Sequence, residues 1–237
     1  DKFEVLKVGE DLGINFPDLN RYELISLIET QGELTESMKS AYEAIIDKDS
    51  ITQSSANAFL DYLTTISKAL SDKEEDTTGY YERFSQLVNV DSLQAVIRRF
   101  NRLLNTDIFL NTSQKLFEEL KDGKTVIIQG TQKMLNLYAS YAVNSCYRKR
   151  RRYVDAMTNE YFPIICMVFD EAHNFCGSDQ ISVTRRIIKE IAQEGRKYGV
   201  FLILASQRMA AIEQTTIAQL STKFIFRIST EKDLEVI

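Results

Sequence analysis

The sequence lacks several features on which common functions depend. Its 237 residues hold 29 Lys and Arg against 34 Asp and Glu, which gives a net charge of −5. This balance excludes a strongly basic protein that coats DNA, although it leaves room for a local basic loop. The sequence contains no signal peptide and no apolar run long enough to span a membrane. We therefore expect a cytoplasmic protein without a membrane partner.

The cysteines and the single histidine argue against a structural metal centre. Cys146, Cys166 and Cys176 do not have the spacing of metal ligands, and His173 has no Cys or His partner at such a spacing. Cys166 falls in an apolar run that predicts a buried strand, which favours a reducing environment. We expect His173 to pack beside a functional site and not to catalyse.

A complete phosphate-binding loop is also missing. Gly123-Lys124-Thr125 matches only the end of the Walker A motif, and Glu118 stands where the motif needs its first glycine. A helix is predicted before this tripeptide and a strand after it, which reverses the order of a true phosphate-binding loop. We interpret Gly123 as a helix end and Lys124 as a solvated side chain. The chain starts without Met, so we expect part of a longer protein, with any Walker A motif upstream of Asp1.

Two apolar runs indicate neighbouring strands of a mainly parallel sheet, and hence an α/β fold. Residues 164–169 and 200–205 are continuously apolar, which is typical of strands covered on both faces. Residues 182–198 between them show helical spacing, and Gly199 ends that helix. A strand, helix and strand with short joints form a right-handed unit with parallel strands. The residues that follow the two strands therefore share one edge, where open α/β sheets bind ligands.

Acidic and polar residues lie at this predicted edge. Asp170 and Glu171 follow the first strand, and Ser206 and Gln207 follow the second. One acid can hold Mg²⁺ through water, the other can polarise an attacking water, and a polar side chain on the next strand can sense the γ-phosphate. An acidic strand end is weak evidence alone, because many strands turn into solvent there. The second strand end makes nucleotide hydrolysis the favoured interpretation.

Residues 33–104 differ from the rest of the chain. Their apolar residues recur at helical spacing on three or four faces, around a polar linker at 71–79. They predict a helical bundle inserted into the α/β core, which comprises residues 1–32 and 105–237. Asp91 is expected to cap one bundle helix. Further strands are predicted at 3–8, 126–130 and 223–228, and further core helices near 21–29, 112–121, 135–147 and 212–220.

Three blocks together resemble the HerA/FtsK superfamily of hexameric DNA-pumping ATPases, and the HerA-like branch most. They are residues 170–175 (Asp-Glu-Ala-His-Asn-Phe), 194–200 (Glu-Gly-Arg-Lys-Tyr-Gly-Val) and 204–208 (Leu-Ala-Ser-Gln-Arg). The resemblance implies a RecA-like P-loop NTPase core that carries an inserted helical bundle. It also implies ATP and Mg²⁺ as cofactors, a hexameric ring and double-stranded DNA as partner. Nucleases are common partners in this family.

The resemblance also implies roles for single residues. Asp170 corresponds to the Walker B acid of the magnesium shell, Glu171 to the catalytic base and Gln207 to the phosphate sensor. Arg196 corresponds to an arginine that reaches the nucleotide of the neighbouring subunit. By position alone, Arg196 is better interpreted as a solvated residue in a last helical turn, and the resemblance reverses this preference.

Other residues and functions stay open. Ser206 is a candidate nucleotide contact, and Arg227 either faces the nucleotide or closes its strand. The basic run at 148–152 is either a solvated helix end or a contact to DNA or a subunit. The favoured function is part of the motor of a double-stranded DNA translocase or helicase, inactive without its Walker A motif. A conjugative secretion ATPase and a non-hydrolysing partner-binding domain are the alternatives. Superfamily-two helicases share the Asp-Glu-Ala-His block, but their next strand ends in Ser-Ala-Thr.

Overall fold

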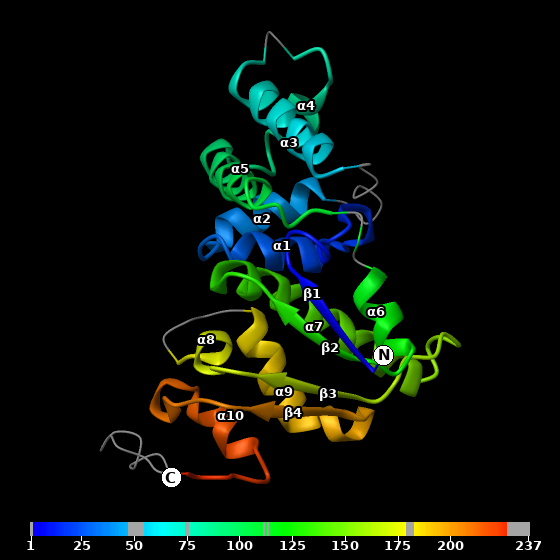
Figure 1. The fold of residues 1–237 in the computed structure, drawn as a ribbon. Coiled ribbons are helices and arrows are strands. Elements are labelled where there is room, and N and C mark those ends of the chain that lie inside the picture. Colours follow the sequence, from blue (N-terminus) through cyan, green and yellow to red (C-terminus); the bar gives the residue numbers. More distant parts are fainter. Residues whose placement is uncertain are drawn as a thin grey trace. The chain divides into compact units, whose positions relative to one another are not determined.

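The protein divides into two compact units, seen in a computed structural model that describes residues 2–46, 55–73, 76–110, 112, 114–178 and 183–226. One unit comprises Asp1–Leu6 and Gln114–Ile237, and the other comprises Lys7–Ser113. In sequence, the second unit thus lies between the two segments of the first (Figure 1). No described helix is both long and apolar enough to cross a membrane.

The unit of residues 7–113 is helical, and it begins earlier in the chain than the predicted bundle. Its core contains aromatic rings from distant segments: the centroid of Phe59 lies 5.6 Å from that of Phe16 and 5.2 Å from that of Phe100. The elements are η1 (Phe16–Asp18), α1 (Arg21–Glu29), α2 (Glu36–Ile45), α3 (Ala56–Ser71), α4 (Tyr80–Phe84) and α5 (Val90–Leu104).

Side-chain caps begin several of these helices. Asn20 accepts hydrogen bonds from the backbone of α1, and Glu23 bonds back to the Asn20 N–H in a capping box. Asn89 caps α5 by accepting a hydrogen bond from Ser92 N at 3.0 Å. The prediction that Asp91 is the cap is therefore wrong by two residues. Asp91 lies in the first turn, where a negative charge stabilises the helix through its dipole.

The other unit mixes strands and helices. Its described strands form two sheets of two strands each, one from β1 (Phe3–Lys7) and β2 (Thr125–Gln129), the other from β3 (Ile165–Phe169) and β4 (Val200–Leu204). The helices are α6 (Gln114–Lys121), α7 (Gln132–Val154), α8 (His173–Cys176), α9 (Val183–Tyr198), η2 (Met209–Ala211) and α10 (Gln214–Gln219). The strand predicted at 223–228 does not form over residues 223–226, and its last residues lie outside the described part of the chain.

β3 and β4 confirm the predicted parallel pair. They pair in parallel with Ile165 opposite Val200 and Phe169 opposite Leu204. The helix between them, α9, packs against β4 (Figure 1). Gly195 permits the close approach. A Cβ atom at Gly195 would lie 2.5 Å from the Val200 carbonyl oxygen, so a larger residue there would push α9 away from the strand.

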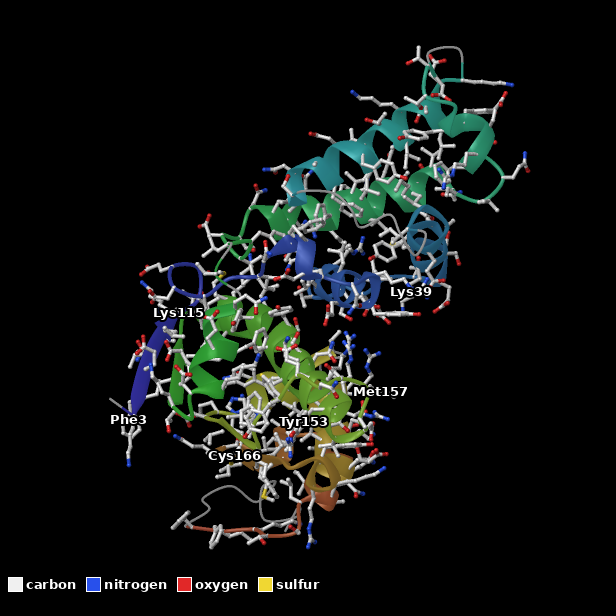
Figure 2. All side chains as sticks on the ribbon, turned by 90° about the vertical axis from the view of Figure 1, so that its right-hand side faces the viewer. Phe3, Lys39, Lys115, Tyr153, Met157 and Cys166 are labelled. Atoms are coloured by element: carbon white, nitrogen blue, oxygen red, sulfur yellow. The ribbon has the colours of Figure 1, made fainter. Side chains whose placement is uncertain are left out.

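The outward face of this sheet is apolar and exposed, which contradicts the prediction of strands covered on both sides. Cys166 pairs with Phe201, and Val168 with Ile203, and all four side chains are exposed. Cys166 is labelled in Figure 2. Val168 retains 65% of its accessible surface. The expected burial of Cys166 is therefore wrong. The apolar run predicted two faces suited to burial, but in β3 only the face that holds Ile165 and Phe169 is buried.

The three cysteines should differ in reactivity. Burial raises the pKa of Cys146 to about 12 and that of Cys176 to about 11, so both thiols stay protonated and shielded near neutral pH. Cys166 is exposed. We expect a thiol reagent to modify Cys166 alone in the native chain and all three cysteines after denaturation. Mass spectrometry of the labelled peptides checks this, with Cys166→Ser as the control. Rapid native labelling of Cys146 or Cys176 would contradict the described packing.

Candidate functional site

The pairing of β3 with β4 continues past the ends of both strands. Ala205 N donates to Phe169 O at 2.9 Å, and Ala172 N donates to Ala205 O at 2.8 Å. The residues after β3 therefore stay beside those after β4. This geometry brings Asp170 and Glu171 to the same edge of the sheet as Ser206 and Gln207, as the sequence predicts.

His173 links the two strand ends. Its Nδ1 lies 3.1 Å from Ser206 Oγ and 3.3 Å from Glu171 Oε2. Ser206 Oγ also accepts a hydrogen bond from Arg208 N at 3.1 Å. The histidine side chain is mostly shielded, so these contacts hold its ring in one orientation. The structure thus places His173 beside the candidate catalytic carboxylate, in contact with both loops.

Glu171 combines backbone strain with an unsatisfied side-chain oxygen. Its φ of +48° lies in the left-handed region, which is costly for a residue with a Cβ atom. Its Oε2 atom is shielded from solvent and accepts no hydrogen bond from any described residue, although His173 lies nearby. Such an oxygen can accept a proton or a hydrogen bond from a bound water. Strain and an unsatisfied polar atom at one residue are typical of functional sites.

Asp170 and Gln207 are exposed at the same edge. Asp170 Oδ1 accepts a hydrogen bond from Glu171 N at 3.0 Å. No group of three or more His, Cys, Asp and Glu side chains in the described ranges is arranged to hold a metal.

Arg196 lies away from these residues. It belongs to the last turn of α9, and α9 returns the chain to the beginning of β4. The strand ends are thus about 16 Å away, the length of a five-residue strand. Arg196 is exposed, and its guanidinium forms no hydrogen bond or ion pair with a described residue. Within one chain, the structure does not bring Arg196 together with Glu171. Arg227, the remaining candidate, lies outside the described residues.

The basic run at 148–152 lies within α7, which continues to Val154. Arg150 donates from Nε to Tyr198 O and from Nη1 to Phe162 O, both at 2.7 Å. Arg151 pairs with Glu190 at 3.2 Å. The interpretation of the run as a solvated helix end is therefore wrong for Arg150, which joins the segments that lead into β3 and β4. Sequence reasoning missed this role, because both partners are backbone carbonyls that no motif marks.

The tripeptide Gly123-Lys124-Thr125 forms no phosphate cradle. Gly123 ends α6 with a φ of +75°, which confirms its interpretation as a helix end. Lys124 forms an ion pair with Glu119, so its ammonium group is partly shielded and not simply solvated. Thr125 begins β2, and its N–H donates to Lys2 O at 2.8 Å. The backbone N–H groups of all three residues thus already donate hydrogen bonds within the fold.

Known proteins resemble the chain over much of its length. Residues 1–149 match the family model described as "Helicase HerA, central domain". The protein "DNA double-strand break repair helicase HerA" of Saccharolobus solfataricus is 30% identical over 150 residues, which cover 60% of this chain and 29% of that protein. Its namesake from Pyrococcus furiosus is 26% identical over 177 residues, which cover 62% and 32%. That of Sulfurisphaera tokodaii is 29% identical over 151 residues, which cover 60% and 30%.

Two limits of these matches bear on the site. The matched part amounts to less than a third of the length of these relatives, 29% to 32%. The residues of the candidate site, from Asp170 to Gln207, lie beyond the span of the family model. The site therefore rests on the geometry of β3 and β4.

The left-handed backbone at Glu171 predicts a difference between two variants. Glycine adopts this φ without strain, whereas alanine does not. We expect Glu171→Gly to unfold with a free energy about 1 kcal/mol higher than Glu171→Ala. Chemical denaturation measures both.

Ala156 offers a matched control, because it too has a positive φ, 55°, and lies outside the site. Ala156→Gly should stabilise the chain by a similar amount. Equal stabilities of the two Glu171 variants, with a stabilised Ala156→Gly, would show that Glu171 is not strained.

Proposed function

Because the chain belongs to the HerA helicase family, whose central-domain model it matches over residues 1–149, we propose that it forms part of an ATP-driven motor that acts on double-stranded DNA. The relatives named above are DNA double-strand break repair helicases, which supports DNA as the substrate. The observation that carries the proposal is the common edge of β3 and β4. There the strained Glu171, with its unsatisfied carboxylate oxygen, lies beside Asp170, Ser206 and Gln207.

Each residue at this edge suits one task in ATP hydrolysis. Asp170 would hold Mg²⁺ through water, and the ion when bound neutralises charge on the β- and γ-phosphates. Glu171 Oε2 would accept a proton from the attacking water. Ser206 and Gln207 would contact the γ-phosphate from the neighbouring strand, and His173 would hold the Glu171 carboxylate and Ser206 hydroxyl in place.

The chain supplies only part of the nucleotide site. Gly123-Lys124-Thr125 is committed to a helix end, an ion pair and a strand, so this tripeptide does not cradle a triphosphate. We infer that a Walker A element comes from another segment of the protein, in a RecA-like core completed by that segment. This chain alone should then bind ATP weakly and hydrolyse none.

Arg196 is suited to act on another subunit. Its guanidinium is exposed near the start of β4, far from the Glu171 of its own chain. A ring of identical subunits, a hexamer in our proposal, would place this edge against a neighbour's nucleotide. An arginine there stabilises the charge that develops on the transferred phosphoryl group.

One alternative function requires the same fold but no ATP hydrolysis. A domain that binds a partner, such as a nuclease, and hydrolyses nothing would also lack a phosphate-binding loop. The grouping of Asp170 and Glu171 with Ser206 and Gln207 at one sheet edge favours the motor, because this set of side chains suits nucleotide hydrolysis. The names of the relatives likewise favour a DNA helicase over a secretion ATPase.

The role of Glu171 predicts a separation of binding from turnover. In the full-length protein, we expect Glu171→Gln to lower the DNA-stimulated rate of ATP hydrolysis at least 100-fold, because the variant cannot accept the proton. Nucleotide affinity should stay within about twofold. Glu118→Gln, which changes an exposed acid of α6, is the matched control and should behave as wild type. Full turnover by Glu171→Gln would remove Glu171 from the mechanism.

The role of Arg196 predicts an effect between subunits. When Arg196→Ala subunits are mixed with wild type, the ATPase rate should fall more steeply than the wild-type fraction, since each variant subunit disables a neighbour's site. Titration of the mixing ratio measures this effect. A rate proportional to the wild-type fraction would place Arg196 outside the neighbour's site.

A further inference from the structure

The loops that follow β3 and β4 are joined at two places. Beside the strands, Ala172 N donates to Ala205 O. Further along, Gly177 and Ile212 form an antiparallel bridge, where Ser178 N donates to Ala211 O at 2.8 Å and Glu213 N donates to Cys176 O at 3.1 Å. Residues 170–178 and 205–213 therefore form a closed frame. All four candidate residues of the strand ends lie within it.

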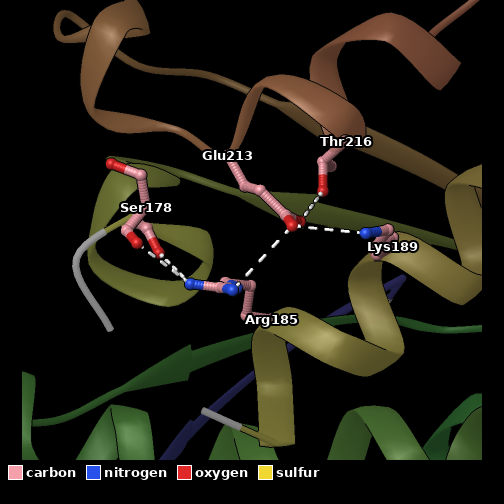
Figure 3. Close-up of polar contacts among 6 residues, drawn as sticks. Ser178, Arg185, Lys189, Glu213 and Thr216 are labelled. Atoms are coloured by element: carbon pink, nitrogen blue, oxygen red, sulfur yellow. Dashed lines mark hydrogen bonds and ion pairs between the residues drawn. The ribbon is translucent and has the colours of Figure 1, made fainter. Parts of the chain in front are cut away.

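Arg185 of α9 holds the far side of this frame. Its Nη1 donates to Gly177 O at 3.3 Å and to Ser178 O at 3.1 Å, both in the loop after β3. Its Nη2 lies 3.8 Å from Glu213 Oε1, in the segment after β4 (Figure 3). One guanidinium thus contacts both loops.

Glu213 is held as a charged partner. Lys189, one helical turn after Arg185, lies 3.3 Å from Glu213 Oε1, and Thr216 Oγ1 donates to Oε2 at 3.0 Å (Figure 3). The carboxylate is 18% exposed. Burial raises its pKa, but hydrogen bonds from Thr215, Thr216 and Lys189 outweigh burial and lower the pKa below its usual value. Glu213 is therefore ionised at neutral pH, and loss of Arg185 would leave a shielded charge with fewer partners.

We propose that Arg185 and Glu213 are positioning residues that keep the two loops in one rigid frame. The loop with Asp170 and Glu171 then cannot shift without the loop with Ser206 and Gln207. A displacement of Gln207 would therefore also displace Glu171, the proposed base. This inference rests on the proposed function for its catalytic consequence, whereas the frame itself is a property of the fold.

The frame is tested in this chain without nucleotide. Arg185→Gln removes the charge and the fork of donors, so the amides of Ser178 and Glu213 should exchange with deuterium about ten times faster. Arg186→Gln is the matched control, because Arg186 is the next residue of α9 and its side chain is exposed. Mass spectrometry of peptides that cover 170–178 and 205–213 measures the rates. Equal exchange in the two variants would overturn the frame.

A double-mutant cycle tests the pair. If Arg185 and Glu213 act on each other, Arg185→Gln with Glu213→Gln should accelerate exchange no more than the stronger single change does. Additive effects would show that the two residues act independently. Should Arg185→Gln unfold the chain, as circular dichroism would reveal, Arg185→Lys takes its place. Lysine keeps the charge but cannot reach two carbonyls and a carboxylate together, so it should also loosen the frame.

The catalytic consequence is tested in the full-length protein. We expect Arg185→Gln to lower kcat about tenfold with unchanged nucleotide affinity, and Arg186→Gln to match wild type. A loosened frame with unchanged kcat would overturn the positioning role. Absence of ATP hydrolysis in the wild-type protein would instead contradict the proposed function, and the exchange rates would still decide whether the frame exists.

Discussion

The parallel, in-register pairing of β3 with β4 determines where the candidate site lies. Both strands end at the same edge, and the backbone ladder continues through Ala172 and Ala205, so the side chains after each strand stay together. α9 is equally constrained, because it must return the chain to the start of β4. The same helix therefore presents Arg185 to the loops and Arg196 to the opposite edge. Antiparallel pairing would have separated the acids from Gln207 and left Arg185 without its two loops.

Apolar runs and helical spacing were sufficient to predict β3, α9, β4 and the shared edge. They reported that both faces of β3 suit burial, but they carry no information on what covers each face, so the burial of Cys166 was predicted wrongly. The strand predicted at 223–228 failed over residues 223–226 for a related reason: an apolar run forms a strand only beside a partner. Contacts between distant residues were out of reach. Arg150 bonds to a carbonyl 48 residues away, and nothing in a basic run marks that partner.

Family and site are supported by different parts of the chain. The family model covers residues 1–149, which include the helical unit, whereas the candidate site begins at Asp170. The motifs that resemble the family and the residues matched by its model therefore do not overlap. Their agreement on one family is stronger than either alone, because an accidental match in one segment has no reason to recur in the other.

The uncovered apolar face of β3 and β4 has a consequence for handling the chain. This face is an exposed apolar surface formed by Cys166, Val168, Phe201 and Ile203. Among the described strands, none pairs with the free edge of β4. Exposed apolar surfaces and free strand edges promote aggregation as the protein concentration rises. Purified samples should therefore stay clear when dilute and turn cloudy when concentrated, and a detergent that coats this face should keep them clear.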